Sequence, residues 1–422
     1  MRYLYSALFY LLLPAVLLRM LWRSRRAPAY RRRLGERFGV FPGLQGNSQP
    51  VIWIHAASVG ETQAARPLIE DLQERFPEAR LVVTTTTPTG SALVRGLFGD
   101  AVFHVYCPWD LPGAVRRFLR RVQPRVLVLM ETELWPNLLH HSRRQGCRVL
   151  LANARMSQRS ARGYARFGRL TRQMLADLDL AACQSAEDAA RLVDLGLDPG
   201  RAAVTGSLKF DFALDAQLQS LAAHLRAQLN RPVLLGASTH PGEEAVILEA
   251  FRSARTVVPD LLCLLVPRHP ERFNEVDGLC RAAGFVVVRR SSGIAVQATD
   301  DILLGDTMGE LRLFCGVASL CVVGGSFIPH GGQNPLEAAA WGVPLLCGPH
   351  MFNFSEITRL LLAGGGMQQL AGGAELAPCV RGLLQDSVRC QAMGSAALAV
   401  VAANRGARER IVAMVAGLLP GH

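Results

Sequence analysis

A glycine-rich stretch from Val322 to Phe354 has the composition of a nucleotide-binding loop. Glycines that let backbone N–H groups approach a ligand follow a short apolar run there: Gly324, Gly325, Gly331 and Gly332. Asn334 is expected to cap a helix that has Pro335 in its first turn, and helix N-termini attract anions. Glu337 is placed one turn later, where it can accept hydrogen bonds from a ribose diol. An ordinary strand-to-helix connection is the alternative interpretation.

Polar side chains also follow four apolar runs in the first half of the chain. The four motifs are His55-Ala-Ala-Ser-Val-Gly-Glu61, Glu131-Thr-Glu-Leu-Trp-Pro-Asn137, Asn153-Ala-Arg-Met-Ser157 and Thr205-Gly-Ser-Leu-Lys-Phe-Asp211. Ser58 and Glu61 match the helix capping box Ser-x-x-Glu. Capping and catalysis are therefore equally good interpretations of Glu61 at this point.

Three further polar motifs follow apolar runs in the second half. Ser238-Thr-His-Pro-Gly-Glu-Glu244 is expected to start a helix, with its two glutamates in the first turn. Pro267-Arg268-His269 places two potential phosphate ligands after a strand, and a surface ion pair is the alternative. The segment Asp306–Leu311 offers backbone N–H groups at the start of another helix.

These motifs require a scaffold that brings them together, and the apolar pattern predicts one. Six short apolar runs precede residue 212: Val51–Ile54, Leu81–Val83, Val102–Val105, Val126–Met130, Val149–Ala152 and Leu180–Ala182. Six more follow it: Val233–Gly236, Leu261–Val266, Phe285–Val288, Ile302–Leu304, Leu320–Val323 and Pro344–Cys347. Helical segments such as Gln63–Phe76 and Leu111–Val122 alternate with them. This pattern is typical of doubly wound parallel sheets, whose ligands bind at the carboxyl ends of the strands.

The chain is long enough for two such α/β domains and an N-terminal extra segment. We expect a membrane anchor with a basic juxtamembrane segment over residues 1–40 and an N-terminal Rossmann-like domain over residues 41–211. A linker helix is expected over 212–231. A C-terminal Rossmann-like domain with closing helices is expected over 232–422.

The first forty residues combine a long apolar segment with most of the excess positive charge. Tyr3–Trp22 is interrupted only by Arg19, and twenty helical residues span about 30 Å. Nine arginines against Glu36 give this segment +8 of the formal charge of +12. Such local basicity favours an anionic membrane surface over nucleic acid, and it predicts that the following domains are cytoplasmic. A signal peptide cleaved near Ala27-Pro-Ala29 is the alternative, but the arginines precede that site.

Lys209 is the only lysine in the chain, which makes it a candidate for a role that needs a compact ammonium group. The ten cysteines have no C-x-x-C pair or metal-ligand spacing, so we expect buried thiols and no metal site. The chain also lacks a P-loop and a G-x-G-x-x-G motif. These absences argue against nucleotide hydrolysis and dinucleotide redox chemistry, and no cofactor is predicted.

Two doubly wound domains with a glycine-rich Asn-Pro-Leu-Glu loop outline a GT-B glycosyltransferase. The four motifs of the first half, together with Pro267-Arg-His-Pro-Glu-Arg272 and His330-Gly-Gly-Gln-Asn-Pro-Leu-Glu337, resemble those of the 3-deoxy-D-manno-octulosonic acid (Kdo) transferases. The resemblance extends from the apolar N-terminal segment to about Phe354. It implies an inverting transfer of Kdo from CMP-Kdo to the lipid A precursor, at the cytoplasmic face of the inner membrane.

The resemblance also implies roles for individual residues. Glu61 would be the general base, and Glu131 and Lys209 would stabilise the transition state. The donor-binding residues would be Pro267, Arg268, His269, Met308, Gly309, Glu310, Ser326, Asn334, Pro335, Leu336 and Glu337. The residues on the acceptor or Kdo side would be Ser58, Gly60, Arg155 and Ser157.

Three alternatives stay open on the sequence. Two are other GT-B enzymes, a lipid glycosyltransferase that uses UDP-sugars and a nucleotide-sugar epimerase. The third is a membrane-tethered binding protein without catalysis. The partners expected for the leading hypothesis are CMP-Kdo, the lipid A precursor and an anionic membrane leaflet, and no nucleic acid.

Overall fold

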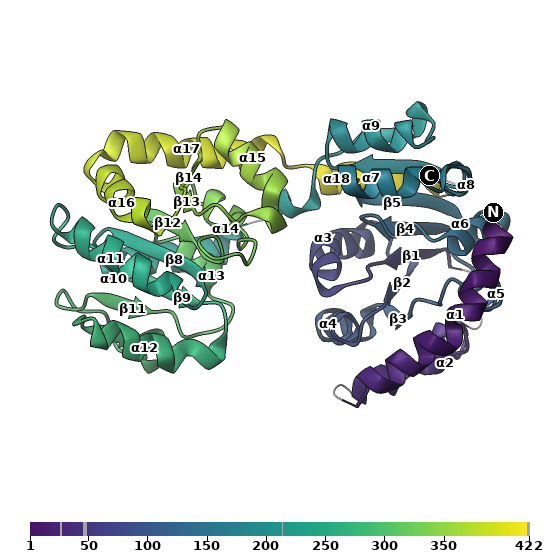
Figure 1. The fold of residues 1–422 in the computed structure, drawn as a ribbon, viewed down its shortest axis with the longest axis horizontal. Coiled ribbons are helices and arrows are strands. Elements are labelled where there is room, and N and C mark those ends of the chain that lie inside the picture. The colour runs from purple at the N-terminus through teal and green to yellow at the C-terminus, as the bar shows by residue number, and fades with distance from the viewer. Residues whose placement is uncertain (26–27, 45–48, 213, 420–422) are drawn as a thin grey trace. The chain divides into compact units, whose positions relative to one another are not determined.

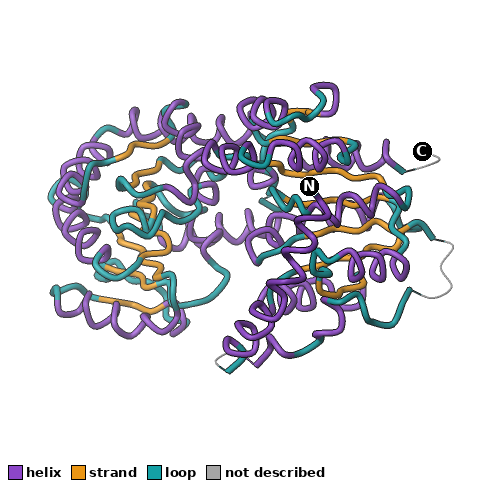
Figure 2. The backbone as a smooth tube through the Cα atoms, turned by 45° about the vertical axis from the view of Figure 1, so that its right-hand side comes forward, coloured by secondary structure: helices purple, strands orange, loops and turns teal. Residues whose placement is uncertain are grey.

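The chain forms two compact units in a computed structural model that describes residues 1–25, 28–44, 49–212 and 214–419. Unit 1 comprises residues 1–212 and 405–422, and unit 2 comprises residues 213–404 (Figure 1). Each unit has one parallel sheet with helices on both faces, as Figure 2 shows. Arg26 of the basic juxtamembrane segment and Ala27 of the alternative signal-peptide site lie outside the described residues.

Unit 1 is built on a seven-stranded parallel sheet with the order β3-β2-β1-β4-β5-β6-β7. Its strands are β1 (Val51–His55), β2 (Arg80–Thr85), β3 (Phe103–Tyr106), β4 (Val126–Met130), β5 (Arg148–Ala154), β6 (Leu180–Cys183) and β7 (Ala202–Val204). The chain order reverses between β1 and β4, and ligands of doubly wound sheets bind at such a switch point. The six predicted strands are confirmed. The edge strand β7 was not predicted because its three residues have no buried side chain.

Two hydrophobic cores cover the two faces of this sheet. The helices of unit 1 are α1 (Arg2–Arg23), α2 (Leu34–Arg37), α3 (Val59–Arg75), α4 (Pro88–Phe98), α5 (Pro112–Val122), α6 (Pro136–Arg144), α7 (Gln158–Ala165), α8 (Gly168–Ala176), α9 (Ala186–Asp194) and α18 (Ala407–Leu418). Trp53 and Leu127 pack against α5, α6 and α8 on one face. Ile54 and Val128 pack against α3, α4 and α18 on the other. Alternate residues of each strand thus enter opposite cores.

Unit 2 repeats this architecture with the strand order β10-β11-β9-β8-β12-β13-β14. Its strands are β8 (Val233–Thr239), β9 (Leu262–Pro267), β10 (Val287–Arg289), β11 (Ile302–Leu304), β12 (Leu320–Val323), β13 (Leu345–Cys347) and β14 (Met367–Gln369). Its helices are α10 (Ala216–Leu229), α11 (Glu243–Arg255), α12 (Phe273–Ala282), α13 (Leu311–Cys315), α14 (Leu336–Ala339), α15 (Ser355–Ala363), α16 (Leu376–Gln385) and α17 (Ser387–Ala403). The switch point lies between β8 and β12. Six strands were predicted, and the three-residue edge strand β14 was not.

The two units differ from the predicted domains at both ends of unit 2. The helix α18 was expected to close the C-terminal domain, but its apolar side chains Ile411 and Val415 belong to a core of unit 1. Asp211 accepts hydrogen bonds from the N–H groups of Gly406 and Arg408 and so fixes the start of α18. The expected linker segment forms α10, which packs on α13 within unit 2.

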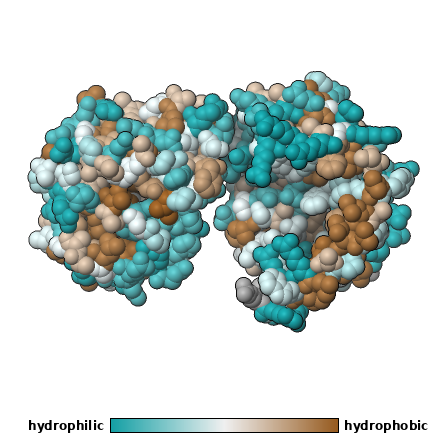
Figure 3. Space-filling model, in the orientation of Figure 1, coloured by the Kyte–Doolittle hydropathy of each residue, from teal (hydrophilic) through white to brown (hydrophobic). Residues whose placement is uncertain are grey.

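Helix α1 has 22 residues and is long and apolar enough to cross a membrane. Apolar side chains gather along it on the surface of unit 1 (Figure 3). Exposed examples are Leu4, Leu11 and Leu18. The predicted anchor segment is therefore one continuous helix.

Candidate active site

Glu61 lies at the carboxyl edge of the unit 1 sheet, in the first turn of α3. Ser58 caps this helix, because its Oγ accepts a hydrogen bond from the Glu61 N–H at 3.3 Å. In return, the Glu61 carboxylate accepts the Ala57 N–H at 2.8 Å and the Ser58 hydroxyl at 2.9 Å. The capping box is thus confirmed, and it makes α3 begin four residues before the predicted start. The space beside Gly60 is open except for Ser58 Oγ.

The environment of Glu61 raises its pKa. Partial burial is the main cause, and the negative charges of Glu133 and Glu131 add to it. The hydrogen bonds from Ala57 and Ser58 act in the opposite direction but do not cancel the effect. Glu61 therefore holds a proton more readily than an ordinary glutamate, while its carboxyl group remains partly exposed. A carboxylate of this kind is suited to accept a proton from a substrate.

Glu131 and Glu133 follow β4, directly across the switch point from Glu61. Glu131 adopts a left-handed backbone conformation with φ of 56°, held by the bond from its N–H to the Ala152 carbonyl at 2.9 Å. A non-glycine residue in this conformation costs about 1–3 kcal/mol, and such strain is concentrated at functional sites. Glu133 accepts the Trp135 indole N–H at 2.8 Å. We refer to Glu61, Glu131 and Glu133 as the carboxylate cluster.

His55, the last residue of β1, lies beneath the carboxylate cluster. Its ring is fully buried, with Nδ1 at 2.9 Å from Thr84 Oγ1 and Nε2 at 3.9 Å from Glu133 Oε2. Nε2 has no hydrogen-bond partner within the part of the chain that the structure describes. His55 and Glu133 lie in two of the polar motifs, but no role was predicted for either residue. Their signal was their place at the ends of neighbouring strands.

Lys209 lies half-buried in a short 3₁₀ turn, Leu208–Phe210. Two contacts fix this turn within unit 1. The side-chain oxygen of Asn153, at the end of β5, accepts the Leu208 N–H at 3.1 Å. Arg410 of α18 donates to the Thr205 carbonyl at 2.7 Å. The segment that carries Lys209 is therefore tied both to the sheet and to the C-terminal helix.

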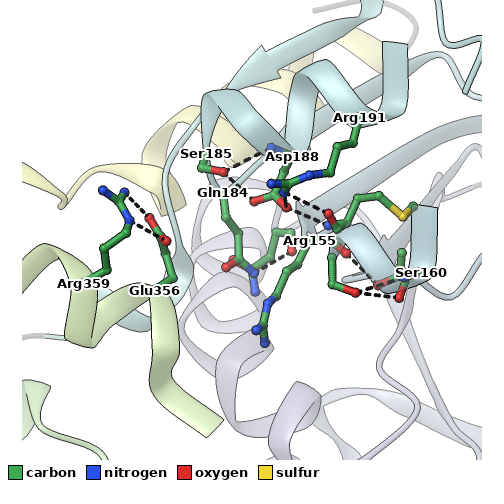
Figure 4. A network of polar contacts seen from close by, with 12 residues as sticks. Arg155, Ser160, Gln184, Ser185, Asp188, Arg191, Glu356 and Arg359 are labelled. Carbon is green, nitrogen blue, oxygen red and sulfur yellow. Dashed lines mark hydrogen bonds and ion pairs between the residues drawn. The ribbon is translucent and has the colours of Figure 1, made fainter. Parts of the chain in front are cut away.

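Arg155 and Ser157 belong to the loop after β5. The Arg155 carbonyl accepts the Thr132 hydroxyl at 2.9 Å, which joins this loop to the one that carries Glu131. Figure 4 shows the Arg155 guanidinium directed away from the nearby pair of Asp188 and Arg191. Ser157 caps α7 through the Ser160 N–H at 3.1 Å and is exposed. The structure therefore gives Ser157 a capping contact, and it leaves the Arg155 head group near the carboxyl edge.

Unit 2 has a glutamate at the same place in its fold. Glu243, in the first turn of α11 after β8, is 1% exposed. It accepts four backbone N–H groups, from His240 at 3.0 Å and from three residues of the glycine-rich loop. The latter are Gly325 at 2.6 Å, Ser326 at 3.0 Å and Phe327 at 3.0 Å. The turn after β12 was expected to offer its N–H groups to a ligand, but the Glu243 carboxylate already uses them.

Two residues of the glycine-rich turn, Ser326 and Gly332, also form internal hydrogen bonds. The Gly332 N–H donates to the Gly325 carbonyl at 2.8 Å. Ser326 is fully buried, where its hydroxyl donates to the Val323 carbonyl and accepts the Gly348 N–H at 2.8 Å. Ser326 was expected to contact the donor. In the structure its side chain is buried, and its two hydrogen bonds join β12 to the end of β13.

Three imidazole rings gather at the carboxyl edge of the unit 2 sheet, and we call His240, His269 and His330 the histidine cluster. The His240 ring centroid lies 4.2 Å from that of His330 and 5.5 Å from that of His269. Burial and the neighbouring His330, His269 and arginine side chains lower the pKa of His240 to about 4, so this ring is neutral at pH 7. Gln333 Nε2 lies 2.9 Å from His240 Nε2.

Arg268 and His269 follow β9 beside the histidine cluster, and both are exposed. Pro267 before them is the buried end of the strand. Arg272 is buried instead and pairs with Glu244, with N–O distances of 2.6 and 3.2 Å. This bidentate ion pair supports the turn that presents Arg268 and His269 to solvent. The two predicted phosphate ligands are thus accessible.

The segment from Asn334 to Glu337 begins the one-turn helix α14. Asn334 Oδ1 accepts the N–H of the buried Leu336 at 3.1 Å. The predicted cap is nevertheless one residue off, because Pro335 is the N-cap and does not lie in the first turn. Burial raises the pKa of Glu337, although Arg312 and Arg268 oppose the shift. Arg312 Nε lies 3.7 Å from Glu337 Oε1. Pro335 adjoins Asn334 and is the residue before the helix.

Met308, Gly309 and Glu310 form the exposed turn between β11 and α13. The Met308 side chain is 66% exposed, and Gly309 has a left-handed φ of 86°. Glu310 pairs with Arg290 at 2.8 Å and also contacts the Thr307 hydroxyl. The pair with Arg290 lowers the pKa of Glu310. This turn therefore offers an open apolar side chain next to a fixed carboxylate.

No group of three or more His, Cys, Asp or Glu side chains is arranged to hold a metal ion within residues 1–25, 28–44, 49–212 and 214–419. Eight of the ten cysteines are buried and two are half-buried. Burial raises the pKa of several of these thiols, for example that of Cys183 to about 12. The prediction of buried thiols is confirmed for those eight.

Comparison with known proteins decides the family. A family model for 3-deoxy-D-manno-octulosonic-acid transferases matches residues 32–212. A 3-deoxy-D-manno-octulosonic acid transferase of Haemophilus influenzae is 39% identical over 97% of this chain and 97% of its own length. One of Bordetella pertussis is 42% identical over 92% of this chain and 94% of its own length. The chain belongs to the 3-deoxy-D-manno-octulosonic acid transferase family.

As a Kdo transferase, the chain is a glycosyltransferase, and the resemblance inferred from the motifs is confirmed. Its fold is similar to that of a glycosyltransferase from Rickettsia africae, with a TM-score of 0.56 and 12% identity over 89% of this chain and 100% of that one. At this identity the likeness concerns the fold alone. The two doubly wound units are those of the predicted GT-B class.

Proposed function

We propose that this Kdo transferase moves Kdo from CMP-Kdo to the lipid A precursor, lipid IVA, with inversion at the anomeric carbon and with Glu61 as the general base. The observation that carries the proposal is the Glu61 carboxyl group. It is partly exposed at the switch point of unit 1, and its pKa is raised by burial and by Glu133 and Glu131. The family membership supplies the sugar.

In the proposed step, the acceptor hydroxyl oxygen attacks the anomeric carbon of Kdo. The bond from that carbon to the phosphate oxygen of CMP breaks, and CMP leaves with the bonding electron pair. The hydroxyl proton passes to Glu61, whose oxygens each have a lone pair left after their single hydrogen bonds to Ala57 and Ser58. One displacement inverts the configuration at the carbon.

Charge is redistributed in this step, and two further residues of unit 1 suit it. The anomeric carbon becomes electron-deficient, so a carboxylate such as Glu131 would stabilise it. Negative charge moves onto the departing phosphate, and the single lysine, Lys209, would neutralise it or the carboxylate of Kdo. Arg155, whose loop is hydrogen-bonded to that of Glu131, would orient the acceptor or Kdo, with Ser58 and Gly60 near Glu61.

The carboxyl edge of unit 2 suits the donor. Arg268 and His269 are exposed and carry N–H groups that bind phosphate oxygens. Glu337, one turn into α14, would accept hydrogen bonds from the ribose hydroxyls, and the exposed Met308 turn would cover the cytosine. Asn334, Pro335, Leu336, Gly309 and Glu310 would shape these contacts from the backbone. Ser326 would act on the donor only through the position of the loop.

The acceptor is a lipid, so we also propose that the chain acts at the cytoplasmic surface of the inner membrane. The exposed apolar side chains of α1 and the arginines that follow it support this location. Anionic lipid headgroups would attract the arginines, and the apolar side chains would enter the bilayer surface.

The test is product mass. The purified protein is reconstituted in vesicles of neutral and anionic phospholipid and incubated with lipid IVA and either CMP-Kdo or a UDP-sugar. The masses of the lipid products are then measured by mass spectrometry. Addition of Kdo from CMP-Kdo, with no product from UDP-sugars, is expected. Donor binding without any lipid product would contradict the proposal and favour a non-catalytic binding protein.

A further inference from the structure

Helix α1 has one partly covered face, on which Ser6 is buried and the other side chains are half-buried, and one open face. The side chains that recur every three or four residues on the covered face are buried or half-buried: Tyr5, Ser6, Phe9, Leu13, Leu17 and Met20. The side chains between them are exposed, for example Leu4 at 67%, Leu11 at 76% and Leu18 at 67%. Figures 1 and 2 show α1 running alongside the unit rather than away from it.

Polar contacts fix the first two turns of α1 to the unit. Ser6, which is buried, exchanges hydrogen bonds with the Asn137 side chain at 3.1 and 3.0 Å. Arg2 donates to Asn137 Oδ1 at 3.1 Å, and the Tyr5 hydroxyl is hydrogen-bonded to Asp110. Asp110 in turn accepts the Asn137 N–H at 3.0 Å. We call these five residues the docking cluster.

The docking cluster lies at the same edge of the sheet as the carboxylate cluster. Asp110 is in the loop after β3, and Asn137 opens α6 in the segment after β4. Asn137 is also the last residue of the motif that begins with Glu131. The loop that carries two of the three carboxylates therefore ends on the residue that holds the apolar helix.

We propose that α1 lies in the plane of the membrane surface instead of crossing it, and that Asp110 and Asn137 hold it so that the carboxylate cluster meets the lipid surface. The occupant of the open face is phospholipid. Most exposed side chains of this face are aliphatic, Tyr3 and Trp22 flank it, and the exposed arginines Arg19, Arg23 and Arg25 lie toward its C-terminal end. Aromatic rings and arginines at such positions are typical of helices at an anionic bilayer surface.

A crossing helix would break the contacts described above. Its covered face would leave unit 1 and enter hydrocarbon, and the Asn137 and Asp110 side chains would lose their partners on α1. Length alone would permit a crossing, since α1 has 22 residues. The contacts of the docking cluster decide between the two arrangements. The catalytic advantage of holding the carboxylate cluster at the membrane rests on the proposed function, because only a lipid acceptor requires this edge of the sheet to lie at the membrane.

The first test is topology, which needs no acceptor. One variant carries a hydrophilic extension with a single cysteine before Met1, and a second carries Val388→Cys, at a side chain that is 77% exposed in unit 2. A membrane-impermeant maleimide is added to sealed right-side-out and inverted membrane vesicles, with the parent chain as background. Labelling of both cysteines from the same side is expected. Labelling from opposite sides would overturn the in-plane arrangement whether or not the protein transfers Kdo.

The second test concerns the docking cluster. Ser6→Val removes the hydrogen bonds to Asn137, and Ala7→Val adds similar bulk on the exposed face of the same helix. Transfer to lipid IVA is measured in bilayers and with the acceptor dispersed in detergent. Ser6→Val is expected to lower the bilayer-to-detergent ratio of rates about tenfold, because buried partners are left unsatisfied, whereas Ala7→Val leaves the ratio unchanged. An unchanged ratio in Ser6→Val, or an equal fall in both variants, would refute the role of the docking cluster.

Discussion

Two glutamates occupy the same place in the two units but have different surroundings. Glu61 and Glu243 each lie in the first turn of the helix that follows the switch-point strand, β1 or β8. Glu61 accepts one N–H and one hydroxyl and is partly exposed. Glu243 accepts four N–H groups and is 1% exposed. The two glutamates therefore have the same position in the fold. They differ in the number of hydrogen-bond donors to the carboxylate, which leaves Glu61 able to accept a proton while Glu243 joins two loops.

The charged groups around the two glutamates also differ. Glu61 adjoins Glu131 and Glu133, which raise its pKa. The edge around Glu243 carries instead the histidine cluster and Arg268, groups that favour an anionic ligand. The acidic edge suits removal of a hydroxyl proton, and the nitrogen-rich edge suits a phosphate. The predictions below test this difference.

The largest expected effect is that of Glu61→Gln. The amide keeps the size of the side chain and can still accept the Ala57 N–H, and the backbone cap from Glu61 N–H to Ser58 Oγ is unaffected, but the amide cannot take a proton. We expect kcat to fall about 10²–10⁴-fold, with little change in CMP-Kdo affinity measured by calorimetry. Near-normal turnover would show that Glu61 only caps α3, as Glu243 only joins loops.

Lys209→Arg is expected to have the next largest effect. Arginine keeps the positive charge but replaces a compact ammonium with a planar, bulkier group. We expect kcat to fall about tenfold to a hundredfold in steady-state assays, with an unchanged midpoint of thermal unfolding. Full activity would mean that any cation suffices at this place.

Glu243→Gln should affect the donor and the fold rather than the chemical step. The amide group would set an N–H donor against N–H groups that now share a carboxylate, at a cost of about 1–3 kcal/mol in the free energy of unfolding. We expect KM for CMP-Kdo to rise several-fold while kcat is nearly unchanged.

The matched control is Glu249→Gln on the same helix α11. Glu249 is exposed, and within the described residues its side chain pairs with Arg252 alone. The KM and the thermal midpoint of this variant should therefore stay close to those of the wild type. A fall of kcat with constant KM in Glu243→Gln would contradict the separation of roles between the two glutamates.

The smallest effect is expected for Glu133→Gln. Removal of this negative charge lowers the pKa of Glu61, because Glu133 is one of the causes of its rise. The acid limb of the kcat/KM profile should then move to lower pH, while the rate at neutral pH falls only slightly. If the acid limb of the kcat/KM profile stays at the wild-type pH, Glu133 does not contribute to the raised pKa of Glu61.

Much of this fold was predictable because periodicity and burial agree. The runs at β1, β4, β9 and β12 are buried on both faces, so their continuous apolar sequences mark them as central strands. The edge strands β7 and β14 have three residues each and little apolar pattern. The place of α18 was not predictable either, since contacts distant in the sequence fix it: those of Asp211, of Arg410 with Thr205, and of its apolar side chains in the core beneath β1.

The site was predictable to the level of motifs but not of partners. The motif Ser58-x-x-Glu61 predicted the helix cap. The neighbouring residues that change the pKa of Glu61 are visible only in the structure. The glycines after β12 predicted open N–H groups, but a carboxylate distant in the sequence, Glu243, accepts the N–H groups of Gly325, Ser326 and Phe327. Long-range hydrogen bonds of this kind leave no local pattern, because any acidic residue at a helix start would look the same.

The central claim is that Glu61 is a titrating base whose surroundings raise its pKa, and the pH dependence of kcat/KM tests it most directly. The base must be deprotonated, so transfer is lost as the pH falls through the raised pKa. The wild type should show an acid limb above the ordinary glutamate value of about 4.3, and Glu61→Gln should lack it. A limb at or below that value, or the same limb in Glu61→Gln, would contradict the account.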